Sequence, residues 1–189
     1  MATALALGSA CAYAGDLANV KWVGEMSVDL VGGDTIRTVT LNNGNTVNAH
    51  ANEGIVLNVG GVIANSKNSP FETQFTLGYK FNIVTSGEPV WYSIPLEVIE
   101  YYNADTLRTG LGLSYHMDSK LKIAGKTTDR FDNALGLVAI VGLIDRNASH
   151  GKLYSIDLRY TFIKYQPSNM TNASKIDGGS LGISISLRN

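Results

Sequence analysis

The most regular feature of this chain is the alternation of apolar and polar residues, which recurs in eight segments separated by turn-rich stretches. In the last segment, Leu181, Ile183 and Ile185 occupy alternate positions, with Gly or Ser between them. A period of two predicts a β-strand whose two faces meet different surroundings. The predicted strands are Trp22–Leu30, Gly54–Ala64, Phe71–Ile83, Val90–Tyr102, Leu107–His116, Phe131–Ile144, Lys152–Lys164 and Ser180–Arg188.

The connections between these strands alternate between short and mostly longer ones. The short ones follow the second, fourth and sixth strands, at Asn65–Pro70, Asn103–Thr106 and Asp145–Gly151. The first connection, Val31–Glu53, is expected to hold its own hairpin, in which Thr35–Leu41 returns through the Asn42-Asn43-Gly44-Asn45 turn. Short turns at one end and long loops at the other are typical of outer-membrane barrels. The pattern therefore predicts an all-β fold, an eight-stranded antiparallel up-and-down transmembrane β-barrel with both termini on the periplasmic side.

The polar faces of the strands consist mostly of Gly, Ser and Thr with isolated charges, which suits the narrow inside of an eight-stranded barrel. Strand parity then places charged residues of both signs in the interior. Because a desolvated charge must be paired or hydrated, we expect an internal salt-bridge network that plugs the lumen. A narrow selective pore is the alternative. The predicted lumen residues are Glu25, Asp29, Glu72, Lys80, Glu97, Arg108, His116, Asp157 and Arg159.

Aromatic residues gather near the predicted strand ends, as they do in the interfacial girdles of membrane barrels. A packed sandwich core is the alternative explanation for the same residues. The set is Trp22, Phe71, Phe81, Trp91, Tyr92, Tyr101, Tyr102, Phe131, Phe162 and Tyr165.

Composition and the N-terminal residues narrow the protein class. The 189 residues are enough for one domain, and the formal net charge of −1 gives no reason to expect nucleic acid as a partner. Residues 1–14 resemble a secretory signal peptide that ends at Ala12-Tyr13-Ala14, although the missing basic n-region suggests a truncated start. A buried helix is the alternative there. We expect residues 15–189 to form the single barrel domain, without cysteine, because Cys11 would be removed.

The last strand carries a more specific signal, with polar, glycine and hydrophobic residues at the spacing of the C-terminal assembly signal of outer-membrane barrels. The matching positions are Ser180, Gly182, Ile185 and Leu187, although the chain ends in Arg188-Asn189 where an aromatic residue is common. From about residue 20 onward the chain resembles the small eight-stranded outer-membrane family. That family includes the outer membrane protein A barrel domain, the outer membrane protein W type, and the lipid A deacylase and palmitoyltransferase.

The resemblance implies the outer membrane of a Gram-negative bacterium as the location. It also implies contact with outer-membrane lipid and lipopolysaccharide, insertion by the barrel assembly machinery, and a monomer. It does not indicate an activity, because the same strand pattern is shared by all of these proteins.

Candidate chemistry is sparse, and the sequence predicts no catalytic residue, metal or cofactor. The lipid A deacylases carry Ser and His on the lipid face, whereas His116 shares the inward parity of Arg108 and Ser114. His50 and His150 fall in connections.

Pro95 is the local irregularity. It cannot donate a hydrogen bond inside a strand, so a bulge or local strand separation is expected there. The palmitoyltransferase resemblance suggests a lateral opening for lipid as the alternative.

We therefore expect a non-enzymatic outer-membrane barrel with a plugged polar lumen and a structural or surface-interaction role through its external loops. The alternatives are a narrow channel for small solutes and a lipid A-modifying enzyme. A soluble lipocalin-like carrier would also have eight alternating strands, but its apolar face would point inward around a ligand.

Overall fold

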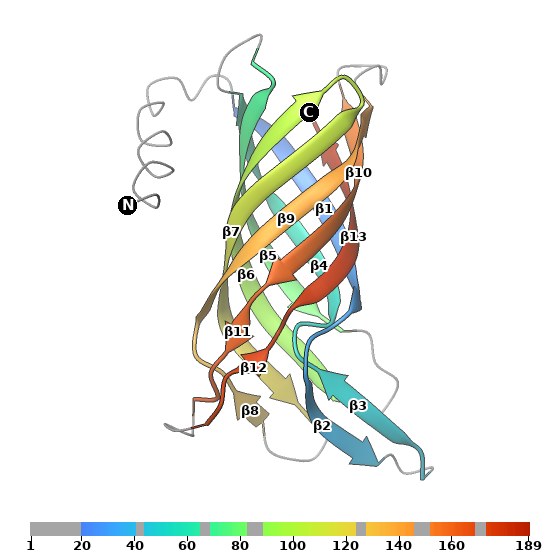
Figure 1. The fold of residues 1–189 in the computed structure, drawn as a ribbon, viewed down its shortest axis with the longest axis vertical. Helices are drawn as coiled ribbons and strands as arrows, with labels where there is room; N and C mark the ends of the chain where they lie inside the picture. Colours follow the sequence, from blue (N-terminus) through green and yellow to red (C-terminus); the bar gives the residue numbers. More distant parts are fainter. Residues whose placement is uncertain are drawn as a thin grey trace.

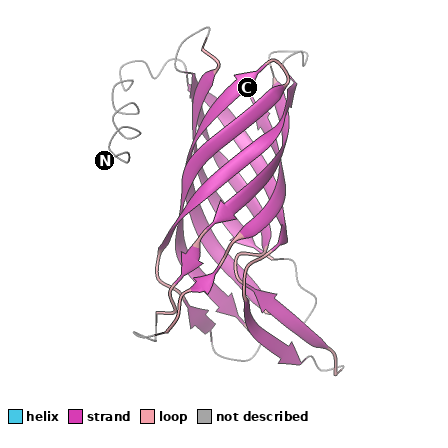
Figure 2. Cartoon of the chain, viewed as in Figure 1, coloured by secondary structure: helices cyan, strands magenta, loops and turns pink. Residues whose placement is uncertain are grey.

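A computed structural model describes residues 20–40, 44–64, 69–82, 89–123, 128–145, 152–168 and 173–189. The predicted signal peptide, with Cys11, and His150 lie outside these residues. The described residues form strands, turns and loops (Figure 2). No helix among them is long and apolar enough to cross a membrane.

Eight strands close into a barrel (Figure 1). Each pairs antiparallel with its neighbours, β1 pairs with β13, and the β6–β7 pairing completes the ring. This confirms the predicted eight-stranded antiparallel barrel. The barrel strands are β1 (Val20–Val31), β4 (Gly54–Ala64), β5 (Phe71–Phe81), β6 (Val90–Ala104), β7 (Leu107–Lys122), β9 (Ala134–Asp145), β10 (Leu153–Phe162) and β13 (Ser180–Arg188).

The remaining strands extend one end of the barrel, called here the loop end, whereas the C-terminus lies at the opposite turn end (Figure 1). The expected hairpin forms between β2 and β3, and its Arg37 guanidinium binds both carboxylate oxygens of Asp129 at 2.6 and 3.0 Å. That contact joins the hairpin to β8. The loop-end strands are β2 (Thr35–Thr40), β3 (Thr46–His50), β8 (Thr128–Arg130), β11 (Lys164–Tyr165) and β12 (Ile176–Asp177).

The apolar face of the barrel strands points outward. Leu111 is 71% exposed and Leu135 is 63% exposed, whereas Arg108 and Ser114 are fully buried inside. A soluble carrier would require the reverse arrangement, so the lipocalin-like alternative is wrong. An exposed apolar belt around a polar interior is the arrangement of a membrane barrel.

One side of the lumen is nevertheless apolar. Ile99 and Tyr101 on β6 pair with Gly112 and Gly110 on β7. On its other edge β7 pairs with β9, so both glycines lie between β6 and β9. A Cβ on Gly110 would lie 2.7 Å from the Tyr101 ring, so the glycine leaves the space that the aromatic ring fills. The cluster that crosses these glycines consists of Ile99, Tyr101, Val138 and Ile140.

Strand β7 continues six residues beyond the predicted end at His116, because a bulge hides its continuation in the sequence pattern. Asp118 has a φ of 48°, and the β6–β7 register shifts between Tyr92 and Ile94. One extra residue reverses the parity of the inward positions. Even-numbered residues face the lumen up to His116, whereas Leu121 is buried beyond the bulge.

The prediction that the aromatic residues near the predicted strand ends form an outer girdle is correct for only some of them. Trp22, Phe71, Tyr102 and Phe162 are exposed on the outer face. The girdle assignment is wrong for four others, which are buried inside because their strand positions face inward. These are Trp91, Tyr101, Phe131 and Tyr165.

Candidate functional site

The nine residues predicted for the lumen all point into the barrel, from β1, β5, β6, β7 and β10. Eight of them are buried, and the Glu72 side chain at the turn end keeps 17% of its surface exposed. Their charges are paired in three groups along the barrel axis, which lie at the centre, the turn end and the loop end.

The central group is built around Arg159 on β10. One guanidinium nitrogen donates to Glu25 at 2.9 Å and the other donates to Glu97 at 2.7 Å. Asn58 and Gln74 donate to the two oxygens of Glu25 at 3.2 and 3.1 Å. Two carboxylates from β1 and β6 are thereby tied across the lumen by one cation from a third strand.

The turn-end group contains two arginines. Arg108 donates to Ser155 at 2.6 Å, lies 3.5 Å from Asp157, and stacks with its guanidinium carbon 3.5 Å from the centre of the Tyr101 ring. Arg188, near the end of β13, donates to Glu72 at 2.6 Å. An arginine stacked on an aromatic ring gains a cation–π contact in addition to its ion pair.

The loop-end group is built around Lys80. Its ammonium binds the carboxylate of Asp29 and donates to both the backbone and the side-chain oxygen of Asn52 at 2.6 Å. Asn52 is fully buried and has a φ of 61°, a conformation that asparagine tolerates better than most residues. Its amide nitrogen donates to the carbonyl of Gly178 at 2.9 Å and to Ser180 at 3.0 Å.

Ser114 and His116 are hydrogen-bonded at 3.0 Å, but the direction of the bond does not fit a hydrolase. Ser114 donates its only proton to Glu97 at 2.9 Å, so Nε2 of His116 must donate to Ser114. An activated serine needs the opposite arrangement, in which the hydroxyl donates to the base. Ser114 is also fully buried, away from the lipid face on which a lipid A deacylase would need it.

Tyr165 on β11 closes this group from the loop end. Its hydroxyl lies 2.7 Å from Nδ1 of His116 and 3.1 Å from the side-chain oxygen of Asn52. Burial raises the pKa of the Tyr165 phenol well above its usual value, and the negative charge of Asp29 adds to the effect. The phenol therefore stays protonated, and its single proton is donated to either His116 or Asn52 at any one time.

The three groups join into one chain of polar contacts. Gln74 links the turn-end group to the centre, because its amide oxygen accepts from Arg188 at 3.3 Å while its nitrogen donates to Glu25. Ser114, His116 and Tyr165 link the centre to the loop-end group. Gln74 and Arg188 face inward, although the predicted lumen set did not include them. Asn52 and Tyr165 were missed, because both lie outside the predicted alternation or near its end. The chain runs through Glu72, Arg188, Gln74, Glu25, Arg159, Glu97, Ser114, His116, Tyr165, Asn52, Lys80 and Asp29.

An apolar cap lies beyond this chain at the loop end. The Trp91 ring centre is 5.2 Å from that of Phe131 and 5.0 Å from that of Tyr165. The cap therefore shares Tyr165 with the polar chain. Its buried members are Ala49, Ala51, Trp91, Leu121, Ile123, Phe131, Ala134, Ile163 and Tyr165.

Pro95 faces the lumen opposite Gly78, where the β5–β6 ladder is interrupted between Leu77–Leu96 and Lys80–Ser93 without a change of register. The register shift lies on its other side, against β7.

In the last strand, Ser180 and Gly182 face inward, whereas Ile185 and Leu187 face outward with exposures of 49% and 43%. Within the described ranges, no group of three or more His, Cys, Asp or Glu residues could hold a metal ion.

Comparison with known proteins supports the fold. No family model and no curated protein matches the sequence. Neisserial surface protein A has a similar structure, with a TM-score of 0.52 and 12% identity over 89% of this chain and 96% of that one. The outer membrane protein AlkL, solved in lipid bilayers, gives a TM-score of 0.42 and 12% identity over 89% and 86% of the two chains. The closed ring of eight strands and the likeness to Neisserial surface protein A show that the chain has the fold of the small eight-stranded outer-membrane β-barrels.

Proposed function

We propose that this chain is a bacterial outer-membrane barrel with a closed lumen, which acts as a structural or surface-interacting protein through its loop end. The observation that carries the proposal is the chain of polar contacts and ion pairs from Glu72 to Asp29. An ion crossing the barrel would have to separate paired charges such as Arg159 and Glu97, and buried charges are costly to leave unpaired. The apolar cap would then have to open as well.

The loop end offers the surface for an interaction. The β2–β3 hairpin extends past the barrel rim, and the Arg37–Asp129 pair ties it to β8 (Figure 1). Exposed loops held on a rigid barrel are suited to binding, because the scaffold fixes their position. No partner is implied by this geometry alone.

A narrow channel is the second candidate, and unpartnered polar atoms in the lumen favour it. The hydroxyl oxygens of Ser27, Thr76 and Ser93 are buried and have no protein partner among the described residues. Buried polar groups of this kind need water, so the lumen has room for some hydration. Isolated water sites without a continuous path do not conduct.

Conductance across a planar bilayer separates the two candidates. The protein should first run faster unheated than heated on a gel, which shows that each preparation holds a folded barrel. We expect the folded protein to add no current steps to those of a protein-free phosphatidylcholine bilayer in concentrated potassium chloride. Reproducible steps from the folded protein would replace the closed-lumen proposal with the channel.

A further inference from the structure

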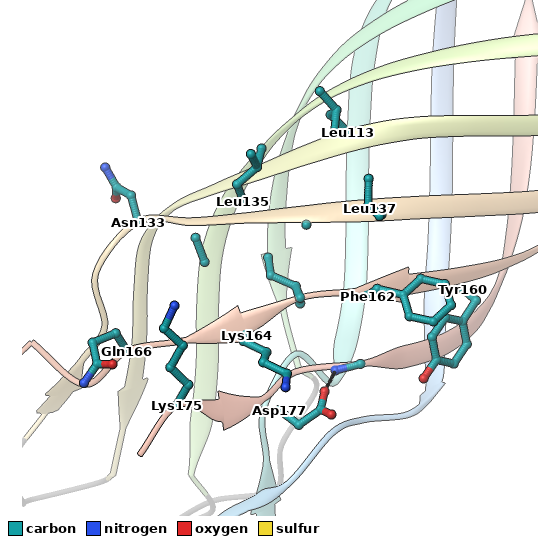
Figure 3. A pocket seen from close by; sticks show the side chains of 14 residues that line it. Leu113, Asn133, Leu135, Leu137, Tyr160, Phe162, Lys164, Gln166, Lys175 and Asp177 are labelled. Carbon is teal, nitrogen blue, oxygen red and sulfur yellow. Dashed lines mark hydrogen bonds between the residues drawn. The ribbon is translucent and has the colours of Figure 1, made fainter. Parts of the chain in front are cut away.

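A groove of about 590 Å³ lies on the outside of the barrel near the loop end, between β9 and the β10–β11 segment (Figure 3). One part of it is apolar and formed by outward-facing side chains, among them Leu135, Leu137 and Phe162. The other part is polar and holds Lys164, Lys175 and Asp177. The groove therefore has an apolar wall on the side of the apolar belt and a charged wall on the side of the loop end.

The groove exists because two neighbouring strands separate. Pairing of β10 with β9 ends at Phe162–Leu137. Ile163 then turns into the apolar cap, and β11 pairs with β12 instead. The two segments meet again at the Phe131–Pro167 bridge. Gly136 and Gly179 are among the residues that line the groove.

The two lysines differ from every cation inside the barrel. Lys80, Arg108, Arg159 and Arg188 each pair with a lumen carboxylate. Lys164 and Lys175 are exposed, and within the part of the chain that the structure describes neither side-chain ammonium group forms an ion pair or a hydrogen bond.

Asp177, whose amide nitrogen donates to the carboxylate of Asp34 at 2.9 Å, supplies the acidic side chain of the groove lining. One of its oxygens accepts the amide proton of Gly179 at 2.8 Å. Counted over the lining residues alone, two lysines and one aspartate give this wall an excess of positive charge.

The position of Lys164 matches the boundary of the apolar belt. It continues the outward face of β10 two residues beyond Phe162, whose ring packs 4.3 Å from that of Tyr160. Aromatic rings on the outer face of a barrel mark the membrane–water interface, where lipid headgroups lie. Lys175 lies at the same level, because the adjacent Ile176 pairs with Tyr165. This places the lysines at headgroup height and the leucines at the height of acyl chains.

We propose that this groove binds a phosphorylated lipid, with Lys164 and Lys175 contacting phosphate and Leu135, Leu137 and Phe162 contacting acyl chains. The proposal rests on the outer-membrane placement proposed above, in which the loop end meets a leaflet of phosphorylated, multiply acylated glycolipid. Charge complementarity selects this occupant over a neutral lipid, which would leave the two lysines without an anionic partner.

The test compares two lipids that share acyl chains, diphosphorylated lipid A and its dephosphorylated form, titrated into the barrel in phosphatidylcholine nanodiscs and counted by native mass spectrometry. The wild type should prefer the phosphorylated lipid about tenfold, since each lysine near an anionic lipid contributes substantially to binding. Lys164→Gln with Lys175→Gln should abolish that preference. Asp177→Asn keeps the oxygen that accepts from Gly179 and removes the opposing charge, so it should strengthen the preference.

The matched control removes the same charge at the other end of the barrel, with Lys21→Gln and Lys152→Gln, both exposed residues near the turn end. This variant should keep the wild-type preference. Equal binding of the two lipids by the wild type, or an equal loss in both double variants, would overturn the proposal.

The apolar wall is tested in the same assay by Leu135→Ser with Leu137→Ser, which should lower the affinity for phosphorylated lipid about fivefold. Leu111→Ser with Leu143→Ser is the control, because these leucines have similar exposures of 71% and 63% outside the groove. A loss of equal size in the control would count against an acyl-binding wall.

Gel mobility and conductance of the same preparations distinguish the two proposals. A folded, non-conducting barrel without lipid preference overturns only the lipid site. A protein that stays in the soluble fraction after export overturns the membrane placement itself.

Discussion

The middle of the barrel and its loop end fill their interiors in opposite ways. The middle is held by charged side chains such as Arg159 and Glu97, which pair across the lumen. The loop end is filled by the apolar cap, in which the Trp91 ring packs against the rings of both Phe131 and Tyr165. Both regions are enclosed by strands of the same sheet, so the difference must come from what surrounds them.

The surroundings explain the inversion. At the level of the apolar belt the outer face meets lipid, so polar residues are left for the inside. Beyond the belt the outer face meets water, and burying apolar side chains inside becomes favourable, as in a soluble domain. Strand β7 shows both cases, because Arg108 is buried before the bulge at Asp118 whereas Leu121 is buried after it and Lys122 is exposed.

The largest effect should come from breaking the charged middle. Arg159→Met removes the cation that ties Glu25 to Glu97 and leaves two buried carboxylates without it. We expect the free energy of unfolding to fall by about 3–5 kcal/mol, the usual cost of removing one partner from a buried ion pair. Urea titration of the barrel in lipid vesicles, followed by gel mobility, measures this change.

Arg37→Met is the control for that experiment, because it breaks an ion pair with Asp129 at the exposed loop end, where the Arg37 side chain keeps 52% of its surface. An exposed pair contributes about 0–1 kcal/mol. If both variants lost the same small amount, the lumen charges would be solvated, and the contrast between the two regions would disappear.

The sequence predicted the middle better than the loop end for a physical reason. Parity assigns a face correctly while the strand is regular, so the nine lumen residues and the eight strands follow from alternation alone. The bulge at Asp118 reverses parity, which is why the inward Leu121 could not be identified. The role of Gln74 depends on cross-strand distances, and that of Asn52 depends on a turn conformation, and neither leaves a periodic signal.

A smaller loss should follow from a cavity in the apolar cap. Leu121→Ala truncates a side chain that is 1% exposed, and we expect a loss of about 2–3 kcal/mol of unfolding free energy. Hydrogen exchange should rise in β2, β3, β11 and β12 and stay unchanged in the middle of β1 and β5. Leu111→Ala, on the outer face, should cost only about 0.5 kcal/mol and leave exchange at the loop end unchanged. Uniformly faster exchange in Leu121→Ala would mean that cap and middle unfold as one unit.

The smallest effect concerns Tyr165, which belongs to both regions because its ring packs in the cap and its hydroxyl lies between His116 and Asn52. Tyr165→Phe keeps the ring and removes the hydroxyl, so it should cost about 1 kcal/mol, the typical net value of one buried hydrogen bond. Tyr160→Phe, whose ring lies on the outer face, should change the unfolding free energy by much less. Exchange measurements add a second readout. If the hydroxyl couples the two regions, the loss of protection in Tyr165→Phe should extend from β11 into β4 beside Asn52, whereas protection lost only in β11 would show that cap and lumen are independent.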